Sequence, residues 1–530
     1  MNETIVNHVL QAALDCGVVE FVVCAGMRNS PFVEVLRLEK RFTTYYWPEE
    51  RSAGFFAFGR TCQTKRPTAV IVTSGTAAAE LLPAAMNAHY LSLPLLLITA
   101  DRPQSFRGSG APQSAEQVGL FGRYTSFAQD VIGPSCDLSK WDQRGTAHLN
   151  VCLEEPQSQP YRGLYQLQTD PKNTKQLDID STEGIDELNH FFSQTKKPLV
   201  IISTLPEESH EALIPFLIDL GAPLFLEGIS GLREEPRLQH LRIRRTDKIL
   251  EAAKEAGYPI DGILRIGGIP THRIWRDLEY LKNQIALCHI TESPFSGLSW
   301  HRSLICTPIK QFILNYQSSC RKKVHFTPEN SFLWLTSELE FEKKLIRLFE
   351  EEPTAETALV HQLSKAIPSH SHLYLGNSLP VREWDMAATS AARGLSITAT
   401  RGSLNGIDGQ ISTFLGMCQP EKENWALLGD LTVLYDLVGP WILSQLPPLR
   451  TTIAIINNGG GKLFERFSTH KEMLNSHNLS FEPLAKMWGL TYHHWEKIPT
   501  IPPNDKDRLI EIVPDDSATK RFWNKYKQLT

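Results

Sequence analysis

Two short stretches, Leu428-Gly429-Asp430 and Ile455-Ile456-Asn457-Asn458-Gly459-Gly460, decide how this chain folds. Each ends a run of apolar residues that is typical of a buried strand. We expect a helical crossover between the two strands. In a right-handed βαβ unit, the two polar strand ends meet at the carboxyl edge of a parallel sheet. The sequence therefore predicts an α/β sheet with a polar site at this edge.

The polar residues at this edge predict a site for a divalent cation. Asp430 offers a carboxylate oxygen, Asn458 an amide oxygen, and the loop a free backbone carbonyl. Mg²⁺ prefers such oxygen ligands and keeps further positions open for a diphosphate. Gly429 and Gly459–Gly461 would let the backbone approach the phosphates closely. Each motif alone is also typical of an ordinary turn or loop, so the prediction depends on finding both at this spacing.

Length and composition are those of a multidomain globular protein. The 530 residues predict about three domains, at roughly 150 residues each. A net charge of −5, with no block of Lys and Arg, gives no indication of a nucleic-acid partner. Nine cysteines without a C-x-x-C pair fit a reducing compartment better than a disulfide framework. With no secretory signal and no apolar run long enough to span a bilayer, we expect a cytoplasmic protein.

Continuous apolar strands alternate with helices along the whole chain, which predicts an α/β fold of three tandem doubly wound parallel sheets. A polar stretch near residues 169–183 and the acidic segment Glu350–Glu352 separate the three units. The predicted domains are therefore residues 1–182, 183–350 and 351–530. The expected strands are 19–25, 42–46, 68–73, 95–99, 198–203, 223–226, 262–266, 285–290, 373–376 and 452–456.

Glycine- and arginine-containing motifs follow the expected strands of both outer units. In chain order they are Gly26-x-Arg28-x-Ser30-Pro31, Glu50-Arg51-x-x-Gly54, Val72-Thr73-Ser74-Gly75-Thr76-Ala77, Thr99-Ala100-Asp101-Arg102-Pro103, Gly376-Asn377-Ser378-x-x-x-Arg382, Arg401-Gly402-x-x-x-Gly406-Ile407-Asp408-Gly409, Gly429-Asp430-Leu431 and Asn457-Asn458-Gly459-Gly460-Gly461-x-Leu463-Phe464. Together they resemble the motifs of the thiamine diphosphate (ThDP)-dependent decarboxylase family. Within that family the resemblance is greatest to the enzymes of menaquinone biosynthesis that join 2-oxoglutarate to isochorismate. The middle unit matches weakly, around Thr271-His272-Arg273.

The resemblance implies how the cofactor is divided between the units. The first unit would bind the pyrimidine ring of ThDP, and the third would bind the diphosphate with Mg²⁺, or Mn²⁺ in its place. Because the family takes these two sites from different subunits, an active chain would be at least a homodimer, with a tetramer favoured. No membrane span or nucleic acid is expected among the partners, which are small-molecule substrates and a second copy of the chain.

The resemblance also assigns roles at the cofactor site. Glu50 would lie against N1′ of the aminopyrimidine ring and exchange a proton there, as a catalytic residue. Asp430, Asn458 and the Gly460 carbonyl would bind the metal, with Asn457 as the alternative to Asn458. Leu463 would support the bent shape of the cofactor. The remaining residues expected to contact ThDP are Ser74, Gly75, Gly406, Ile407, Asp408, Gly429 and Leu431.

Four arginines, Arg28, Arg102, Arg382 and Arg401, follow expected strands, where ligands of α/β sheets bind. A guanidinium stays protonated and binds carboxylates with two parallel hydrogen bonds. Four such groups indicate a substrate pair rich in carboxylates, which the resemblance identifies as 2-oxoglutarate and isochorismate. Arg382 and Arg401 would hold the carboxylates of 2-oxoglutarate, and Gln113 would lie near the reacting carbon of the cofactor. All three are expected to be catalytic residues. The other expected substrate contacts are Arg273, Asn377, Ser378 and Phe464.

The reaction implied by the resemblance is that of a transferase: 2-oxoglutarate is decarboxylated, and the succinyl carbanion equivalent is added to isochorismate. Met27, Pro112 and His272 depart from the family pattern, in which Ser, Asn and Lys are usual. Two alternatives stay open. One is another ThDP-dependent 2-oxo acid decarboxylase or acetolactate-type lyase, although the middle unit has no G-x-G-x-x-G fingerprint for a flavin. The other is a catalytically silent relative.

Overall fold

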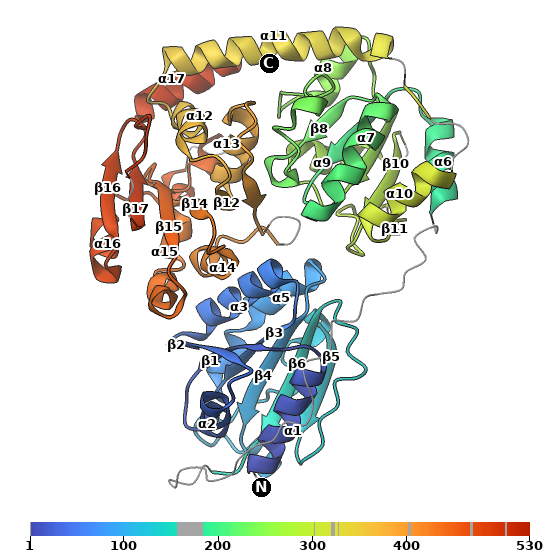
Figure 1. Ribbon diagram of the computed structural model, residues 1–530. Helices are drawn as coiled ribbons and strands as arrows, with labels where there is room; N and C mark the ends of the chain where they lie inside the picture. The colour runs from blue at the N-terminus through green and yellow to red at the C-terminus, as the bar shows by residue number, and fades with distance from the viewer. Residues whose placement is uncertain are drawn as a thin grey trace. The chain divides into compact units, whose positions relative to one another are not determined.

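The computed structural model describes residues 2–155, 184–282, 284–301, 303–319, 324–326, 328–400, 404–466, 470–503 and 506–529. It contains three sheets, and every paired strand in them is parallel to its neighbour (Figure 1). The predicted α/β class with three parallel sheets is therefore confirmed. The polar stretch near 169–183 lies outside the described residues. The chain divides into two compact units, Met1–Leu177 with Asp408–Cys418 and Leu434–Pro448, and Asp178–Ile407 with Gln419–Val433 and Leu449–Thr530.

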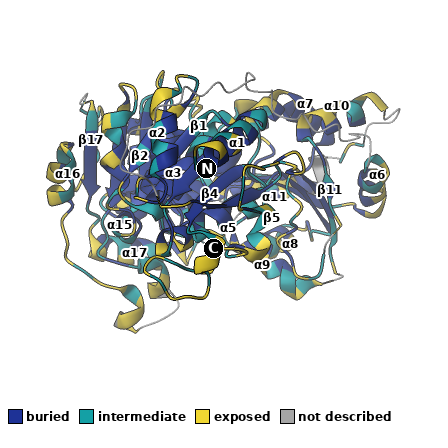
Figure 2. Cartoon of the chain, turned by 90° about the horizontal axis from the view of Figure 1, so that it is seen from below, coloured by how far each residue is buried: buried dark blue, intermediate teal, exposed yellow. Residues whose placement is uncertain are grey.

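The first unit is built on a six-stranded sheet of order β2-β1-β3-β4-β6-β5. The inner strands β3, β4 and β6 are buried along their whole length, as is typical of continuous apolar runs in a parallel sheet; Figure 2 shows the burial of β4. The last strand in this order, β5, lies at the sheet edge and is mostly half-buried or exposed. The strands are β1 (Glu20–Cys24), β2 (Thr43–Trp47), β3 (Thr68–Val72), β4 (Leu95–Asp101), β5 (Thr125–Val131) and β6 (Thr146–Cys152).

Helices of the first unit follow the strand ends predicted from the sequence. The helix α3 begins at Glu50, and the side chain of Glu49 caps its first turn. The helices are α1 (Asn2–Asp15), α2 (Ser30–Leu38), α3 (Glu50–Thr64), α4 (Thr76–Ala79), α5 (Leu82–Tyr90) and α14 (Gln410–Met417), with short 3₁₀ turns η1 (Gln104–Phe106), η2 (Gly122–Tyr124) and η7 (Gly439–Gln445).

The helices α3 and α14 pack closely through glycines. A Cβ atom on Gly416 would lie 2.5 Å from the Phe56 carbonyl oxygen and 2.9 Å from the Arg60 amide nitrogen, and Gly59 faces α14 equally closely. These neighbours are backbone atoms, which cannot move without shifting the helix. A buried hydrogen-bonded group adds to the contact, because Asp436 accepts from the hydroxyls of Ser52 and Ser412 at 2.9 Å each.

We expect Gly416→Ala to lower the free energy of unfolding by about 1–3 kcal/mol, the usual effect of overpacking. The gain in helix propensity, about 1 kcal/mol at most, does not offset a clash with backbone atoms. Denaturant unfolding at equilibrium measures the difference. Gly133→Ala is the matched control, since no atom lies within 4 Å of its Cβ position. Equal stability of the two variants would contradict the packing described for α3 and α14.

The second unit contains the other two sheets, which have five strands in the order β11-β10-β9-β7-β8 and six in the order β13-β12-β14-β15-β17-β16. The strands of the middle sheet are β7 (Pro198–Ile202), β8 (Leu224–Leu226), β9 (Gly262–Ile266), β10 (Ala286–Thr291) and β11 (Ile305–Cys306). Those of the third sheet are β12 (His372–Leu375), β13 (Ser396–Thr398), β14 (Glu423–Gly429), β15 (Arg450–Ile456), β16 (Thr491–Trp495) and β17 (Asp507–Ile512).

One long helix, α11 (Pro328–Glu351), contributes to the cores of both sheets of this unit (Figure 1). Trp334 near its start packs with Tyr258 in the middle part, and Phe341 and Leu345 belong to the core of the third sheet. The other helices are α6 (Ile185–Gln194), α7 (His210–Leu220), α8 (Ile249–Glu255), α9 (Arg273–Asp277), α10 (Ile309–Ser319), α12 (Glu356–Ala366), α13 (Leu379–Ala387), α15 (Asp430–Leu434), α16 (Glu482–Trp488) and α17 (Asp516–Tyr526).

The two strands that opened the sequence analysis are neighbours. β14 pairs with β15 over seven positions, the last of which joins Gly429 to Ile456. On its other side β14 pairs with β12, with Leu427 opposite Leu375. The carboxyl ends of β12, β14 and β15 therefore lie side by side, as the predicted edge site requires.

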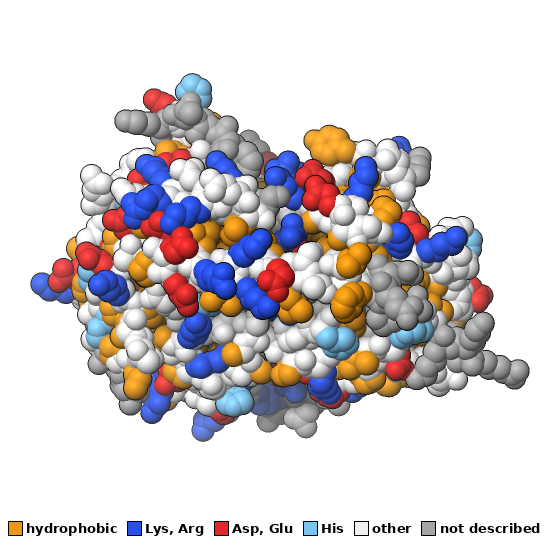
Figure 3. Space-filling model, turned by 90° about the horizontal axis from the view of Figure 1, so that it is seen from above, with side chains coloured by type: hydrophobic (Ala, Val, Ile, Leu, Met, Phe, Trp, Pro, Cys, Tyr) orange, Lys and Arg blue, Asp and Glu red, His pale blue; other side chains and the backbone are white. Residues whose placement is uncertain are grey.

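No helix in the described part of the chain is long and apolar enough to cross a membrane. On the face drawn in Figure 3, basic and acidic side chains are interspersed, in keeping with the small net charge of −5.

Candidate active site

Asp430 ties the end of β14 to the loop after β15. It is the first residue of α15, follows β14 directly, and is 3% exposed. Its Oδ2 accepts hydrogen bonds from the amides of Gly459 and Gly460, both at 2.9 Å, and its Oδ1 accepts from the Leu431 amide at 2.6 Å. Gly460 has φ of 138°, which favours glycine. Two stretches of chain thus converge on one carboxylate.

Burial raises the pKa of the Asp430 carboxyl above its ordinary value, while the backbone amides and nearby His477 act in the opposite direction. The His477 Nε2 atom lies 3.3 Å from Asp430 Oδ2. A divalent cation beside this carboxylate would favour its charged form. Binding of a cation beside Asp430 would therefore offset the cost of burying its charged carboxylate.

Asn458 has a buried oxygen atom that no described residue contacts by a hydrogen bond. Its Nδ2 donates to both oxygens of Glu356 at 3.0 Å, but its Oδ1 has no hydrogen bond among the described residues. A buried acceptor left unsatisfied costs about 1–3 kcal/mol. An amide oxygen is a ligand that Mg²⁺ accepts, so the donor set fits the predicted cation.

The neighbouring asparagine is used differently. The Asn457 amide donates to Glu511 Oε1 at 2.6 Å and to the Leu479 carbonyl at 2.8 Å, which fixes it against the protein. The Gly460 carbonyl accepts from the Lys462 amide at 2.9 Å and retains a second lone pair. Of the two asparagines, Asn458 has the side chain suited to bind a cation.

Glu49 and Glu50 have separate environments in the first unit. The two oxygens of Glu49 accept from the amides of Arg51 at 3.0 Å and Ser52 at 2.8 Å, so its carboxylate caps α3. Glu50 is half-buried at the first helical position. Burial raises the pKa of its carboxyl, and the charges of Glu49 and Glu80 add to this effect. A carboxyl group that holds a proton more readily is suited to general acid–base catalysis.

The loops after β3 and β4 bring further predicted residues together. Ser74 is buried, and Gly75 has φ of 88° and donates its amide to Gln117 at 2.9 Å. A Cβ atom on Gly75 would lie 3.5 Å from the Cα of Gln113. Arg102 donates from Nε to the Pro112 carbonyl at 3.0 Å. The exposed Gln113 loop therefore lies against both Gly75 and Arg102.

The chain is similar to known proteins along its length. The family model described as "Thiamine pyrophosphate enzyme, N-terminal TPP binding domain" matches residues 3–120. A protein of Bdellovibrio bacteriovorus named 2-succinyl-5-enolpyruvyl-6-hydroxy-3-cyclohexene-1-carboxylate synthase is 40% identical, over 100% of this chain and 99% of its own. Proteins with the same name from Akkermansia muciniphila and Lysinibacillus sphaericus are 33% and 28% identical, over 96% and 98% of this chain and 95% and 97% of theirs.

The chain belongs to the 2-succinyl-5-enolpyruvyl-6-hydroxy-3-cyclohexene-1-carboxylate synthase family. It is a ThDP-dependent enzyme, and its three parallel sheets are those of the ThDP-dependent enzymes.

In this member of the synthase family, the end of β12 gathers several residues predicted to bind substrate. The Asn377 amide donates to Gly406 O at 2.7 Å and to Thr400 Oγ1 at 3.1 Å, which leaves its Oδ1 buried without a partner among the described residues. Ser378 has φ of 73° and accepts a hydrogen bond of 2.5 Å from Arg382 Nη1 at its carbonyl. Arg401 lies outside the described residues.

Arg28 is 6% exposed, and protein groups already bind its guanidinium. Nη1 donates to the Leu153 carbonyl at 3.0 Å and Nη2 to Glu155 Oε2 at 2.6 Å. The Glu155 side chain is 73% exposed, so a substrate carboxylate could displace it without opening the core. Beside Arg28, Met27 is 70% exposed and does not fill the interior.

The remaining predicted site residues belong to several different elements. Arg273 is on the surface of α9 and pairs with Asp277 at 3.3 Å. Phe464 is 43% exposed in the 3₁₀ turn η8 (Lys462–Arg466), where Leu463 is half-buried. Asp408 groups with the first unit, whereas Gly406 and Ile407 group with the second. The roles of these residues remain predictions.

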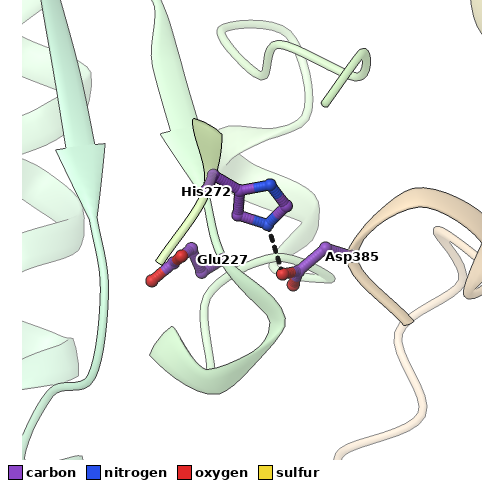
Figure 4. Close-up of side chains that lie close together, drawn as sticks. All are labelled: Glu227, His272 and Asp385. Atoms are coloured by element: carbon purple, nitrogen blue, oxygen red, sulfur yellow. Dashed lines mark hydrogen bonds and ion pairs between the residues drawn. The ribbon is translucent and has the colours of Figure 1, made fainter. Parts of the chain in front are cut away.

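A buried cluster at α13, shown in Figure 4, was not predicted from the sequence. His272, one of the departures from the family pattern, lies with Nε2 2.5 Å from Asp385 Oδ2, and the Gly228 amide donates to Asp385 Oδ1 at 2.5 Å. Glu227, His272 and Asp385 offer ligand atoms within 4.8 Å of one another. Because His272 and Asp385 already bind each other, we interpret the cluster as a contact that holds α13.

Arg233 completes this contact. It is 2% exposed. Its guanidinium donates to the carbonyls of Asp385 at 3.2 Å, Ala388 at 2.7 Å and Thr389 at 3.0 Å. These carbonyls end α13, where a helix lacks partners for its last oxygens and favours a cation. No local pattern marks this contact in the sequence, because its members are far apart along the chain. His272 and Asp385 are more than 110 residues apart.

We expect Asp385→Ala to lower the free energy of unfolding by about 3 kcal/mol, because two buried donors, Gly228 N–H and the His272 ring, would lose their acceptor. Thermal or denaturant unfolding measures the loss. Asp277→Ala is the control: it removes the exposed ion pair with Arg273, which contributes about 0–1 kcal/mol. Unchanged stability of Asp385→Ala would show that the cluster does not hold α13.

Proposed function

We propose that this chain is a ThDP- and Mg²⁺-dependent carboligase. It decarboxylates 2-oxoglutarate and adds the remaining succinyl unit to isochorismate, giving 2-succinyl-5-enolpyruvyl-6-hydroxy-3-cyclohexene-1-carboxylate and CO₂. The observation that carries the proposal is the end-to-end similarity to relatives named for making this product. The reaction belongs to menaquinone biosynthesis.

The residues at the ends of β14 and β15 fit the diphosphate end of the cofactor. Asp430, Asn458 and the Gly460 carbonyl would bind Mg²⁺, and the unpartnered Asn458 oxygen supports this assignment. Gly429 leaves room for phosphate, since a Cβ atom there would meet only Thr432 Oγ1, at 3.7 Å. Bound ThDP supplies a nucleophilic carbon that adds to the keto carbon of a 2-oxo acid and stabilises the charge left when CO₂ departs.

Glu50 would hold a proton at the pyrimidine N1′ atom. Its raised pKa supports this role, because a carboxyl group that shares a proton with a ring nitrogen must give it up and take it back near neutral pH. Glu50 and Asp430 belong to different units of the chain. We propose that one subunit contributes Glu50 and its partner the diphosphate site, so that a homodimer is the smallest active form, and the chain forms a tetramer by resemblance.

The substrates together carry four carboxylates, and arginine is the residue suited to bind them. Arg382 and Arg401 would hold 2-oxoglutarate, and Arg28 and Arg102 isochorismate. Gln113 lies against Arg102 and Gly75 through its loop, which supports a place for it near the reacting carbons. Asn377, Ser378, Phe464 and Arg273 would complete the substrate contacts.

The test is a substrate panel with purified protein, ThDP and Mg²⁺, in which 2-oxoglutarate or pyruvate is supplied with and without isochorismate. We expect isochorismate loss only with 2-oxoglutarate, accompanied by an equal amount of CO₂. Turnover of pyruvate alone would instead indicate an acetolactate-type lyase. ThDP binding without turnover of any substrate would indicate a catalytically silent relative. Either of these results would overturn the proposal.

A further inference from the structure

A buried glutamate far from the metal-binding motifs contacts the proposed metal ligand Asn458. Glu356 is the first residue of α12 and is 3% exposed. Both of its carboxylate oxygens accept from Asn458 Nδ2 at 3.0 Å, across 102 residues of sequence. Its backbone amide donates to Thr519 Oγ1 at 3.0 Å, which fixes the start of the helix.

The contact decides which way the Asn458 amide points. An asparagine side chain has a donor end and an acceptor end, and either could face a given neighbour. An ionised carboxylate only accepts hydrogen bonds, so the nitrogen of Asn458 must face Glu356. The oxygen is then directed away from Glu356, and it has no partner within the described residues. A neutral or donating group at position 356 would remove this constraint.

The charge of Glu356 also suits its place. It lies in the first turn of an 11-residue helix, where the helix dipole favours a negative group. The residue after Asn458 donates its amide to Asp430, so Glu356 and Asp430 hold adjacent positions of the same loop. Two buried acids thus contact this loop, one through the side chain of Asn458 and one through the backbone.

We propose that Glu356 is a positioning residue for the metal site: it holds the Asn458 amide so that Oδ1 faces the divalent cation bound by Asp430. In this proposal Glu356 is not itself a ligand, and both of its oxygens accept from Asn458 Nδ2. The inference rests on the proposed function, since this cation is the one that accompanies the diphosphate of ThDP. Groups that orient a metal ligand commonly change metal affinity 10- to 100-fold when they are removed.

The test is titration of Mn²⁺ followed by electron paramagnetic resonance, at saturating ThDP, which gives the metal Kd without any turnover. We expect Glu356→Ala to weaken Mn²⁺ binding about 10- to 100-fold. Glu356→Gln, which is nearly isosteric, keeps one acceptor but adds a donor, so its Kd is expected between those of the wild type and Glu356→Ala. It also provides a folded variant if alanine destabilises the chain.

A double-mutant cycle separates orientation from general structural effects. Asn458→Ala removes the group that Glu356 is proposed to orient, so adding Glu356→Ala to it should weaken Mn²⁺ binding no further. Glu482→Ala is the matched control, an exposed glutamate at the first position of α16 in the same unit, and its Kd should equal that of the wild type.

Three results would overturn the proposal, and each has a distinct meaning. Wild-type affinity in both Glu356 variants would show that Asn458 needs no orienting partner. A double variant weakened by the product of the two single effects would show that Glu356 acts independently of Asn458. If the wild type binds no Mn²⁺ in the presence of ThDP, the metal site of the proposed function fails, and the positioning role fails with it.

Discussion

Replacing Glu50 by glutamine is expected to lower kcat about 100- to 10,000-fold, the range typical of a lost general acid–base group. Glutamine fills the same space and can still accept a hydrogen bond, but it cannot exchange a proton with the pyrimidine N1′ atom. The affinity for ThDP and Mg²⁺ should change little, because the diphosphate site does not include this residue. Steady-state kinetics and calorimetric titration of ThDP measure the two effects separately.

Glu49→Gln is the matched control for Glu50→Gln. Its carboxylate caps α3, so glutamine there should lower the free energy of unfolding by about 1 kcal/mol at most, with kcat retained within a few-fold. A large loss of kcat in Glu49→Gln with full activity in Glu50→Gln would show that Glu49, and not Glu50, transfers the proton.

The second large effect is expected at Asp430. Asp430→Ala should weaken ThDP-dependent Mn²⁺ binding by at least about 100-fold, because a direct ligand contributes more than the groups that orient it. The amides of Gly459 and Gly460 would also lose their acceptor, which loosens the loop that carries Asn458. Electron paramagnetic resonance of added Mn²⁺ measures the affinity, and activity should fall with metal occupancy.

The control for Asp430→Ala is Asp516→Ala. Asp516 forms surface ion pairs with Lys462 and Lys520 and is half exposed, so its removal should leave Mn²⁺ affinity unchanged. If Asp430→Ala bound Mn²⁺ as tightly as this control, the metal site would lie elsewhere in the chain.

Much of the fold follows from the sequence because parallel strands buried on both faces appear as continuous apolar runs. The strands β3, β7 and β9 are of this kind, and their predicted positions are confirmed within a residue or so. Other strands were not predicted, among them the edge strands β5 and β16 and the buried inner strands β6 and β17. β5 alternates half-buried and exposed residues over its first half, and β16 has only one buried residue, so neither forms a continuous apolar run.

The candidate site was predictable where function depends on short local motifs. Asp430 and the Asn458 loop lie together as expected, since adjacent parallel strands bring their carboxyl ends to one edge. The structure shows that Glu49 caps α3, which the motif alone could not indicate, and the choice of Glu50 for proton transfer stays a prediction. Glu356, Asp385 and Arg233 act through partners more than 100 residues away, so no local pattern indicates them.

The most direct test of the account is to follow carbon from 2-oxoglutarate that is fully labelled with ¹³C. The purified enzyme would be given ThDP, Mg²⁺ and unlabelled isochorismate, with mass spectrometry of product and CO₂. The proposed reaction predicts one labelled CO₂ for each isochorismate consumed, and a product that carries the four remaining labelled carbons. Labelled CO₂ without transfer of label to isochorismate would contradict the proposed function.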